Sequence, residues 1–355
     1  MGHGGRFLQG KSLSRHVGAA LGQSPLAHRT GADGWNPQVM IDRRRVAVAA
    51  VAISCALATG CGSRPTTSPT PVAVKGSPCG DLPPRSASYA HVIWLWMENH
   101  SYDQIIGSGS APYLNSLAEK CGLATNYHNI THPSLPNYVA ATSGVGLGAL
   151  QRFLTDCDPS PACSTKATSL FDQARDWRAY EESMPTACDR QDSGDYAVRH
   201  NPPLYYPGLA GCQRRDVPLA SLHSDLAHGS LPSFSFITPN LCHDTHDCPV
   251  ESGDRWLASE VPQIVDSRSY RSGHSVLFIT YDEGEGGSAT HCATNQTDVG
   301  CQVATVVVSP TTRAGERSGK LFDHYSLLRT TEDLLGLPHL GKAAGAASMA
   351  KAFGL

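Results

Sequence analysis

Apolar runs that are typical of buried strands alternate along the chain with helix-like patterns. Four short runs are rich in β-branched and aromatic residues, which favours strands; they are residues 91–97, 233–237, 275–281 and 302–308. Four other segments space their apolar residues three and four apart, as helices do; they are residues 113–120, 169–182, 254–265 and 323–335. Strands alternating with helices predict an α/β fold with a mostly parallel central sheet and helices on both faces.

Residues 157–218 interrupt this alternation. The segment is rich in Pro, Tyr and Cys and has weak periodicity. We interpret it as a cap insertion that is pinned by disulfides and would lie over the functional site.

The chain contains 12 Cys, of which ten lie beyond Cys61. An even number in an exported chain favours disulfides, although connectivity stays open at this point. A zinc site is disfavoured because no two Cys are separated by two residues. Proximity in sequence suggests the pairs Cys79–Cys121, Cys157–Cys163, Cys188–Cys212, Cys242–Cys248 and Cys292–Cys301.

The N-terminal part has the features of an export leader. Three arginines, Arg43 to Arg45, precede an apolar stretch that is too short to span a bilayer. Residues 57–61 resemble a lipobox that would lipidate Cys61, although its leucine lies one position early. The alternatives are ordinary secretion or a structural Cys, and Cys55 is a weaker candidate for lipidation. Met40 precedes the leader closely enough to be an alternative start.

These features divide the chain into three parts. Residues 1–60 would be leader and export signal, and residues 61–85 a Ser/Pro/Thr-rich tether without a core. Residues 86–355 would form the globular domain. Residues 61–355 carry 21 Lys or Arg against 29 Asp or Glu, which argues against nucleic-acid binding. A site that handles phosphate would then need local positive charge, and a bound metal ion is the obvious source.

Oxygen-bearing side chains follow two of the predicted strands. Glu98 and Asn99 come directly after residues 91–97, and Asp282 and Glu283 come after residues 275–281. Open α/β sheets bind ligands at the carboxyl ends of their strands. The pattern therefore predicts a divalent-cation site, for which calcium, magnesium, zinc and iron are all compatible. An Asn that caps the next turn would explain the first pair by itself.

A serine lies between two prolines in the segment that follows. Pro133 and Pro136 exclude Ser134 from the interior of a helix or a central strand, and Pro136 suits the first turn of a helix. Ser134 would thus lie near a helix N-terminus, which favours anions. A cation-bound hydroxyl there would be a nucleophile, and Asn137 could donate to a phosphoryl oxygen. The alternative is a plain N-cap in a turn.

Two further places combine histidine with acidic residues. His243, Asp244, His246 and Asp247 lie within five positions, a density that suits metal binding or proton transfer. A solvated loop is the alternative. His324 follows an ordinary capping Asp at the start of the last predicted helix, and it belongs either to the site or to the surface.

Five segments that contain these residues occur in one order and carry a family resemblance. They are residues 97–103, 131–138, 239–247, 281–283 and 324–338. Together they resemble the bacterial phosphoesterase family of acid phosphatases and phospholipases C, within the alkaline-phosphatase-like superfamily. They are most similar to secreted mycobacterial-type members that act on phosphoinositides. Residues 157–212 match nothing that can be carried over.

The resemblance implies an alkaline-phosphatase-like fold and a role for each matching residue. The implied metal ligands are Glu98, Asn99, Ser134, Asp282 and Glu283, with Ser134 also the nucleophile. Asn137, His246 and His324 match residues near the phosphate. His132, Asp244 and Asp247 are adjacent candidates with less support, and His243 departs from the family pattern.

We therefore expect an exported, metal-dependent phosphoric-ester hydrolase, and first of all an acid phosphomonoesterase with a phosphoseryl intermediate. One alternative is a phospholipase C or other phosphodiesterase on the same scaffold. A more distant one is a surface lipoprotein that binds a cation or phosphate without catalysis. The expected partner is a phosphate-ester substrate, with no nucleic acid, no obligate protein partner, and membrane contact only through Cys61.

Overall fold

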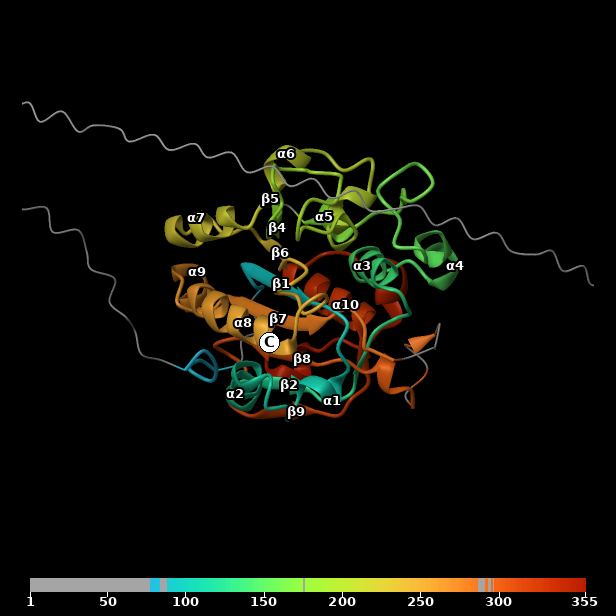
Figure 1. Ribbon diagram of the computed structural model, residues 1–355. Helices are drawn as coiled ribbons and strands as arrows, with labels where there is room; N and C mark the ends of the chain where they lie inside the picture. Colours follow the sequence, from blue (N-terminus) through green and yellow to red (C-terminus); the bar gives the residue numbers. More distant parts are fainter. Residues whose placement is uncertain (1–76, 84–87, 175, 287–290, 293–294, 296) are drawn as a thin grey trace, which may run out of the picture. The chain divides into compact units, whose positions relative to one another are not determined.

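A central eight-stranded sheet organises the chain, seen here in a computed structural model (Figure 1). The structure describes residues 77–83, 88–174, 176–286, 291–292, 295 and 297–355. The predicted leader, Met40 and Cys61 lie outside these residues. None of the described helices is long and apolar enough to cross a membrane.

The strands follow the spatial order β5-β4-β6-β1-β7-β8-β2-β9. Their bounds are β1 His91–Met97, β2 Gly122–Ala124, β4 Trp177–Glu181, β5 Asp216–Pro218, β6 Phe234–Thr238, β7 Ser275–Tyr281, β8 Thr305–Val308 and β9 Glu316–Ser318. Strands β5, β4, β6, β1 and β7 are mutually parallel, β8 is antiparallel to β7 and β2, and β2 is parallel to β9. A small second sheet pairs β3 (Tyr127–His128) with β10 (Phe322–Asp323). The predicted mostly parallel sheet is confirmed.

Helices cover both faces of the sheet (Figure 1). They are α1 Tyr102–Ile105, α2 Pro112–Lys120, α3 Ser134–Ser143, α4 Leu147–Leu150, α5 Leu170–Gln173, α6 Cys212–Arg215, α7 Ala220–His228, α8 Val250–Val265, α9 Arg268–Arg271, α10 His324–Leu335 and α11 Ala350–Phe353.

Side-chain alternation along β1 decides which helix covers which face, because successive strand residues point to opposite sides. Trp94 donates from Nε1 to Thr331 Oγ1 of α10 at 3.0 Å, and the Trp96 ring lies 5.4 Å from that of Tyr138 in α3. Met97 points the other way, because its Cε would lie 2.9 Å from a Cβ at Gly253 of α8. Helices therefore cover β1 on both faces. The polar residues that follow it lie at the rim of the sheet.

The predicted strands agree well with the structure, and one predicted helix does not. Residues 91–97 and 275–281 are β1 and β7 without a shift, whereas residues 302–308 form a strand only from Thr305. Residues 169–182 do not form one helix. Helix α5 stops at Gln173, and Trp177–Glu181 is strand β4.

The segment predicted as a cap is only partly an insertion. Its strands β4 and β5 extend the central sheet, so this part is integral to the fold. Disulfides Cys157–Cys163 and Cys188–Cys212 pin the remainder, as expected.

All five predicted disulfides are confirmed. Besides the two above, they are Cys79–Cys121, Cys242–Cys248 and Cys292–Cys301. The first one shows that the end of the predicted tether belongs to the domain. Cys79 is buried, and Pro78 accepts a hydrogen bond from Tyr270 Oη at 2.7 Å. The attachment of the chain thus begins before residue 86.

Candidate active site

The carboxyl ends of β1 and β7 bring the two predicted acidic pairs together. The strands pair in parallel register, with Met97 opposite Tyr281, so Glu98 and Asp282 leave the sheet side by side. Asn99 turns back at φ 52, and its backbone N–H donates to Asp282 Oδ1 at 3.0 Å. A positive φ is one that Asn tolerates better than most residues, which explains its use at this turn.

Ser134 lies against this pair from a distant part of the chain. It is the first residue of α3, follows the cis-Pro133 peptide, and is buried. Its hydroxyl donates to Glu98 Oε2 at 3.0 Å and lies 3.4 Å from Asn99 Oδ1. The predicted serine and the predicted acidic pairs therefore meet at one point.

The acidic side chains of this site raise one another's affinity for protons. Glu98 and Asp282 are completely buried, and burial raises the pKa of each well above its usual range. Repulsion by Asp282 adds to the effect at Glu98, and repulsion by Glu283 adds to it at Asp282. Burial raises the pKa of Glu283 to about 9 and that of Asp244 to about 7. So many buried carboxyls in one place are unfavourable unless protons or a cation neutralise them.

The donor atoms of the site fit a divalent cation. Asp282 Oδ2 is buried and has no hydrogen-bond partner among the described residues. It accompanies carboxylate, amide and hydroxyl oxygens of Glu98, Asn99 and Ser134, the oxygen donors that hard cations select. Glu283 is turned somewhat aside, because its Oε2 lies 2.9 Å from Nδ1 of His132.

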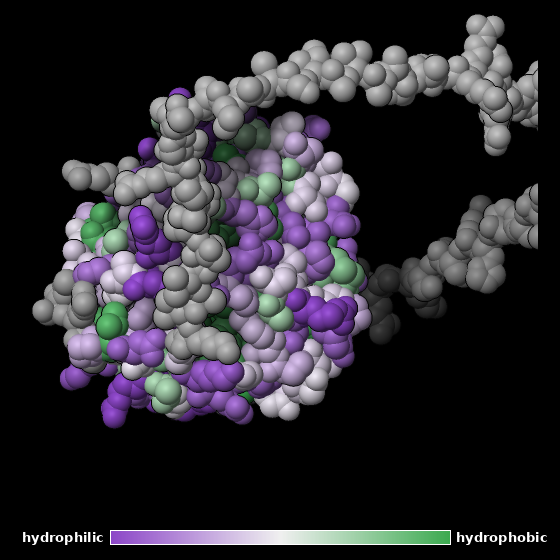
Figure 2. Space-filling view, turned by 90° about the vertical axis from the view of Figure 1, so that its left-hand side faces the viewer, coloured by the Kyte–Doolittle hydropathy of each residue, from purple (hydrophilic) through white to green (hydrophobic). Residues whose placement is uncertain are grey.

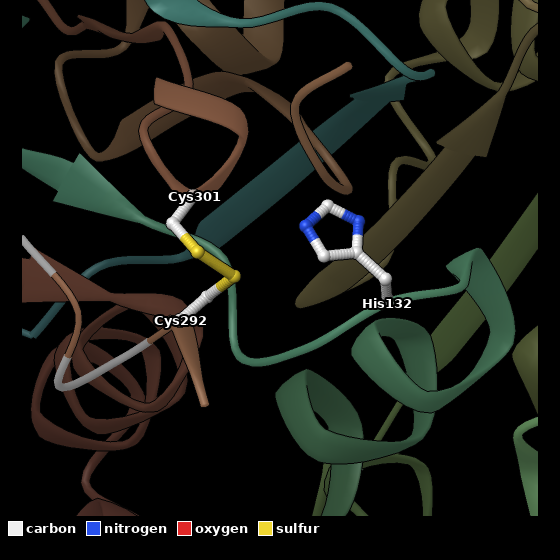
Figure 3. Close-up of side chains that lie close together, drawn as sticks. All are labelled: His132, Cys292 and Cys301. Atoms are coloured by element: carbon white, nitrogen blue, oxygen red, sulfur yellow. A yellow bond between two sulfur atoms is a disulfide. The ribbon is translucent and has the colours of Figure 1, made fainter. Parts of the chain in front are cut away.

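His132 faces a disulfide rather than a metal-binding thiol pair. Its imidazole points toward the bond between Cys292 and Cys301 (Figure 3), and a ring nitrogen lies within 4.8 Å of both sulfurs. Because the sulfurs are bonded to each other, they are not free to bind a metal. His132 instead links the loop before α3 to Glu283.

The loop between β6 and α8 places its histidine and acidic residues unequally. Asp244 is buried, and it accepts the backbone N–H of His246 at 2.7 Å. His246 Nδ1 lies 2.6 Å from Asp247 Oδ1, and Asp247 is exposed. His243 turns away from the site to Glu182, with Nδ1 2.9 Å from Oε2.

Asn137 and His324 are buried, and their polar atoms already have partners. Asn137 Nδ2 donates to the carbonyls of Thr131 and Pro133, and its Oδ1 accepts two backbone N–H groups of the same loop. His324 Nε2 lies 2.6 Å from the Asp282 carbonyl, and Tyr127 Oη is 3.0 Å from Nδ1. Both residues therefore shape the backbone around Ser134 and Asp282.

Sequence reasoning missed two residues that contact Glu98. Tyr138 donates from Oη to Glu98 Oε1. His200 is buried, and its Nε2 lies 3.4 Å from Glu98 Oε2 while Nδ1 lies 3.2 Å from Asp244 Oδ2. No local pattern marks His200, which comes from the weakly periodic segment; Tyr138 could have been found one helical turn after Ser134.

A cavity of about 640 Å³ opens beside these residues. Polar residues of four segments dominate its wall, which also contains Pro133 and Pro249. The lining residues are Asn99, His100, His132, Pro133, Thr245, His246, Asp247, Cys248, Pro249, Glu283, Gly284, Glu285 and Gly286.

A parallel sheet that presents a serine hydroxyl among buried acids at its strand ends defines a hydrolase-type site. The chain belongs to the Phosphoesterase family, whose profile matches residues 108–338. It is an acid-phosphatase-like hydrolase of phosphoric esters, and several of the relatives that it matches are named acid phosphatases.

Two relatives that are named phosphatases match most of this chain, and a phospholipase C matches a smaller part of it. A phosphatidylinositol-3-phosphatase of Mycobacterium tuberculosis is 29% identical over 263 residues, which is 73% of this chain and 81% of that protein. A probable acid phosphatase of Kluyveromyces lactis is 27% identical over 74% of this chain and 62% of its own length. A non-hemolytic phospholipase C of Burkholderia pseudomallei is 29% identical over only 31% of this chain and 20% of its own length.

Solved structures resemble the fold at low sequence identity. One from Bacteroides thetaiotaomicron, from work on the metabolism of multiple glycosaminoglycans, has a TM-score of 0.50 at 11% identity and covers 76% of this chain and 82% of its own. A protein in the alkaline phosphatase superfamily from Vibrio parahaemolyticus has a TM-score of 0.49 at 12% identity, with 74% and 71% covered.

Proposed function

We propose that the protein is an exported, metal-dependent acid phosphomonoesterase that acts through a phosphoseryl intermediate. The observation that carries the proposal is the contact of a buried serine hydroxyl with Glu98 and Asn99 at the rim of the sheet. A plain N-cap would direct its hydroxyl to the helix backbone, and Ser134 directs its hydroxyl to a carboxylate instead.

A divalent cation would be held by Glu98, Asn99, Ser134, Asp282 and Glu283. When bound, it supplies the positive charge that lowers the pKa of the serine hydroxyl and offsets the phosphoryl charge. The buried, partnerless Asp282 Oδ2 and the surplus of acidic groups support this assignment.

Ser134 is the group that exchanges bonds with phosphorus in this proposal. Its Oγ forms the new P–O bond as the bond to the ester oxygen breaks, and the leaving alcohol takes up a proton. The serine hydroxyl gives up its proton along its hydrogen bond to Glu98 Oε2. Water then attacks the phosphoserine, which releases phosphate and restores the hydroxyl.

Three histidine or amide side chains would support this exchange in different ways. His246 lines the cavity and would contact the phosphoryl oxygens or the leaving group. Asn137 and His324 would act through the backbone, holding the loop before Ser134 and the Asp282 carbonyl in place.

The cavity favours a polar monoester over a phospholipid as substrate. Its wall is largely polar, and among the described residues Val299 is the one large hydrophobic side chain that is well exposed. Figure 2 shows a face on which hydrophilic residues prevail and hydrophobic ones are scattered. A phospholipase would be expected to present a contiguous apolar surface for its lipid. The headgroup of a phosphoinositide remains a substrate to test, because the mycobacterial relative is named for it.

Export is supported by the disulfides as well as by the leader. Five disulfides in the described residues require an oxidising compartment to form and persist. Whether Cys61 carries a lipid is tested by mass spectrometry of the mature N-terminus.

The function is tested by steady-state hydrolysis of p-nitrophenyl phosphate and bis-p-nitrophenyl phosphate, with and without chelator. We expect the monoester to be preferred, chelation to abolish activity and a divalent metal to restore it. Ser134→Ala and Glu98→Ala should each lower kcat by roughly 1,000-fold or more, because each removes part of the reacting centre. Undiminished monoester hydrolysis by Ser134→Ala would overturn the proposal, and preference for the diester would move the function to phosphodiesterase.

A further inference from the structure

The four segments that line the cavity contain no permanently charged cationic side chain. Residues 97–103, 129–138, 240–250 and 281–301 hold neither Lys nor Arg. The same segments supply Glu98, Asp244, Asp282 and Glu283. A phosphate monoester carries up to two negative charges, so its binding needs a cationic contact in addition to any metal.

The N-terminus of α3 does not supply that contact by itself. The backbone N–H of Leu135, which follows the nucleophile, already donates to Asp156 Oδ1 at 2.9 Å. Asp156 thereby places a carboxyl group beside the first turn of α3. The helix end that the sequence predicted as an anion site is therefore occupied by a carboxylate.

One arginine reaches the site from the weakly periodic segment. Arg199 lies in the short 3-10 turn Val198–His200, and its Nη2 lies 3.3 Å from Nε2 of His246, a cavity-lining residue. Its neighbour His200 approaches Glu98, whose Oε2 accepts the Ser134 hydroxyl. The positive charge of Arg199 acts to lower the pKa of both Asp156 and Asp244, against the larger effect of burial.

The contact with Arg199 determines which ring nitrogen of His246 carries a hydrogen, and this matters for phosphate binding. A guanidinium can only donate, so His246 Nε2 accepts and Nδ1 carries the hydrogen that Asp247 Oδ1 accepts. This neutral imidazole is a weak partner for a guanidinium. Two phosphoryl oxygens are a better one, because a guanidinium binds them through paired, charge-assisted hydrogen bonds.

We propose that Arg199 binds the non-bridging oxygens of the substrate phosphate and selects monoesters over diesters. The inference rests on the proposed function and deepens it. A monoester dianion offers Arg199 two charged oxygens together, whereas a diester has one charge and a second ester group in the way. Arg199 exchanges its contact with His246 for the phosphate, and Nε2 of His246 then becomes free to face the leaving group.

The test compares Arg199→Ala and Arg199→Lys with wild-type enzyme on the monoester and diester p-nitrophenyl substrates. Loss of charge-assisted hydrogen bonds predicts a fall in kcat/KM for the monoester of roughly 30-fold in Arg199→Ala and of less than about 3-fold for the diester. The Ki of inorganic phosphate should rise by about 10-fold. Lysine should recover part of both effects, because it keeps the charge without the fork.

Controls separate phosphate binding from a merely structural role. Arg178→Ala removes an arginine that pairs with Asp225, and it should leave the ratio of the two substrates unchanged. The double variant Arg199→Ala/His246→Ala should be worse than His246→Ala; equality would mean that Arg199 acts only through His246, and would overturn the proposal. Equal losses on both substrates with an unchanged phosphate Ki would overturn it as well. Absence of monoester hydrolysis in the wild type would contradict the proposed function itself.

Discussion

Several residues that hold the site together are hard to identify from local sequence patterns. His200 stacks on Tyr138, with ring centroids 5.5 Å apart at an interplanar angle of 7°. Tyr138 in turn donates to Glu98, so the ring of His200 helps to orient the carboxylate that accepts the serine hydroxyl. Burial lowers the pKa of His200 well below its usual range, so it packs there as a neutral ring.

We predict that His200→Ala damages both stability and catalysis. Truncating a buried ring leaves a cavity, which costs about 3 kcal/mol in the free energy of unfolding. Glu98 loses its support, so kcat should fall by roughly 10-fold or more while the variant remains folded. Urea unfolding and monoester kinetics measure the two effects. His223→Ala, which removes an exposed histidine paired with Glu260, is the control; the same kcat in both variants would refute a role for His200.

Among the elements, the disulfide-closed loop of residues 292–301 connects both halves of the site. Cys292 donates its backbone N–H to the Ile130 carbonyl and Cys301 accepts from Asn129, just before the nucleophile. The Gly300 carbonyl accepts the N–H of Gly284, just after the acidic pair. The loop thus fixes the distance between the end of β7 and the start of α3.

The double variant Cys292→Ser/Cys301→Ser should therefore lose activity out of proportion to stability. Replacing Cys79 and Cys121 in the same way removes a disulfide that lies outside the segments lining the cavity. This should mainly lower the free energy of unfolding, by about 2–4 kcal/mol. The measurement is kcat at a temperature where both variants are folded, with thermal melting alongside. Equal residual activity in the two variants would show that the loop does not position the site.

Elements that are buried on both faces were predictable from the sequence, and those formed by long-range pairing were not. Strands β1 and β7 have continuous apolar runs, so their bounds agree to the residue. In residues 169–182, Ser169 does cap a helix, but pairing with β6 makes Trp177–Glu181 a strand. The same limit holds for the site: strand ends and prolines indicated Glu98, Asp282 and Ser134, whereas Arg199 and His200 come from a segment whose placement depends on its disulfides and tertiary contacts.

Buried carboxyl groups outside the site make the stability of the whole molecule depend on pH. Burial raises the pKa of Asp216 to about 7 from 3.8 and that of Glu332 to about 7 from 4.5. Between roughly pH 4 and 7 the folded chain keeps protons that the unfolded chain has lost. The contribution of these two carboxyls to the free energy of unfolding therefore falls as pH rises through this window and levels off above it.

Asp216→Asn should flatten this dependence. Asparagine can keep a hydrogen bond to Asn201, whose Nδ2 lies 2.9 Å from Asp216 Oδ1, but it has no proton to lose. We expect Tm at pH 8 to rise relative to wild type and Tm at pH 4 to change little. Asp266→Asn alters an exposed carboxylate and should leave the profile unchanged. A wild-type slope retained in Asp216→Asn would show that this group does not contribute.

In the proposed mechanism Ser134 takes the phosphoryl group before water does. Two successive in-line displacements at phosphorus each invert it, so their product retains the original configuration. The most direct measurement is the stereochemical course of phosphoryl transfer from a monoester with a phosphorus made chiral by oxygen isotopes to an added alcohol acceptor. A phosphoseryl intermediate predicts retention; inversion would mean a single direct displacement by the acceptor and would rule out the intermediate.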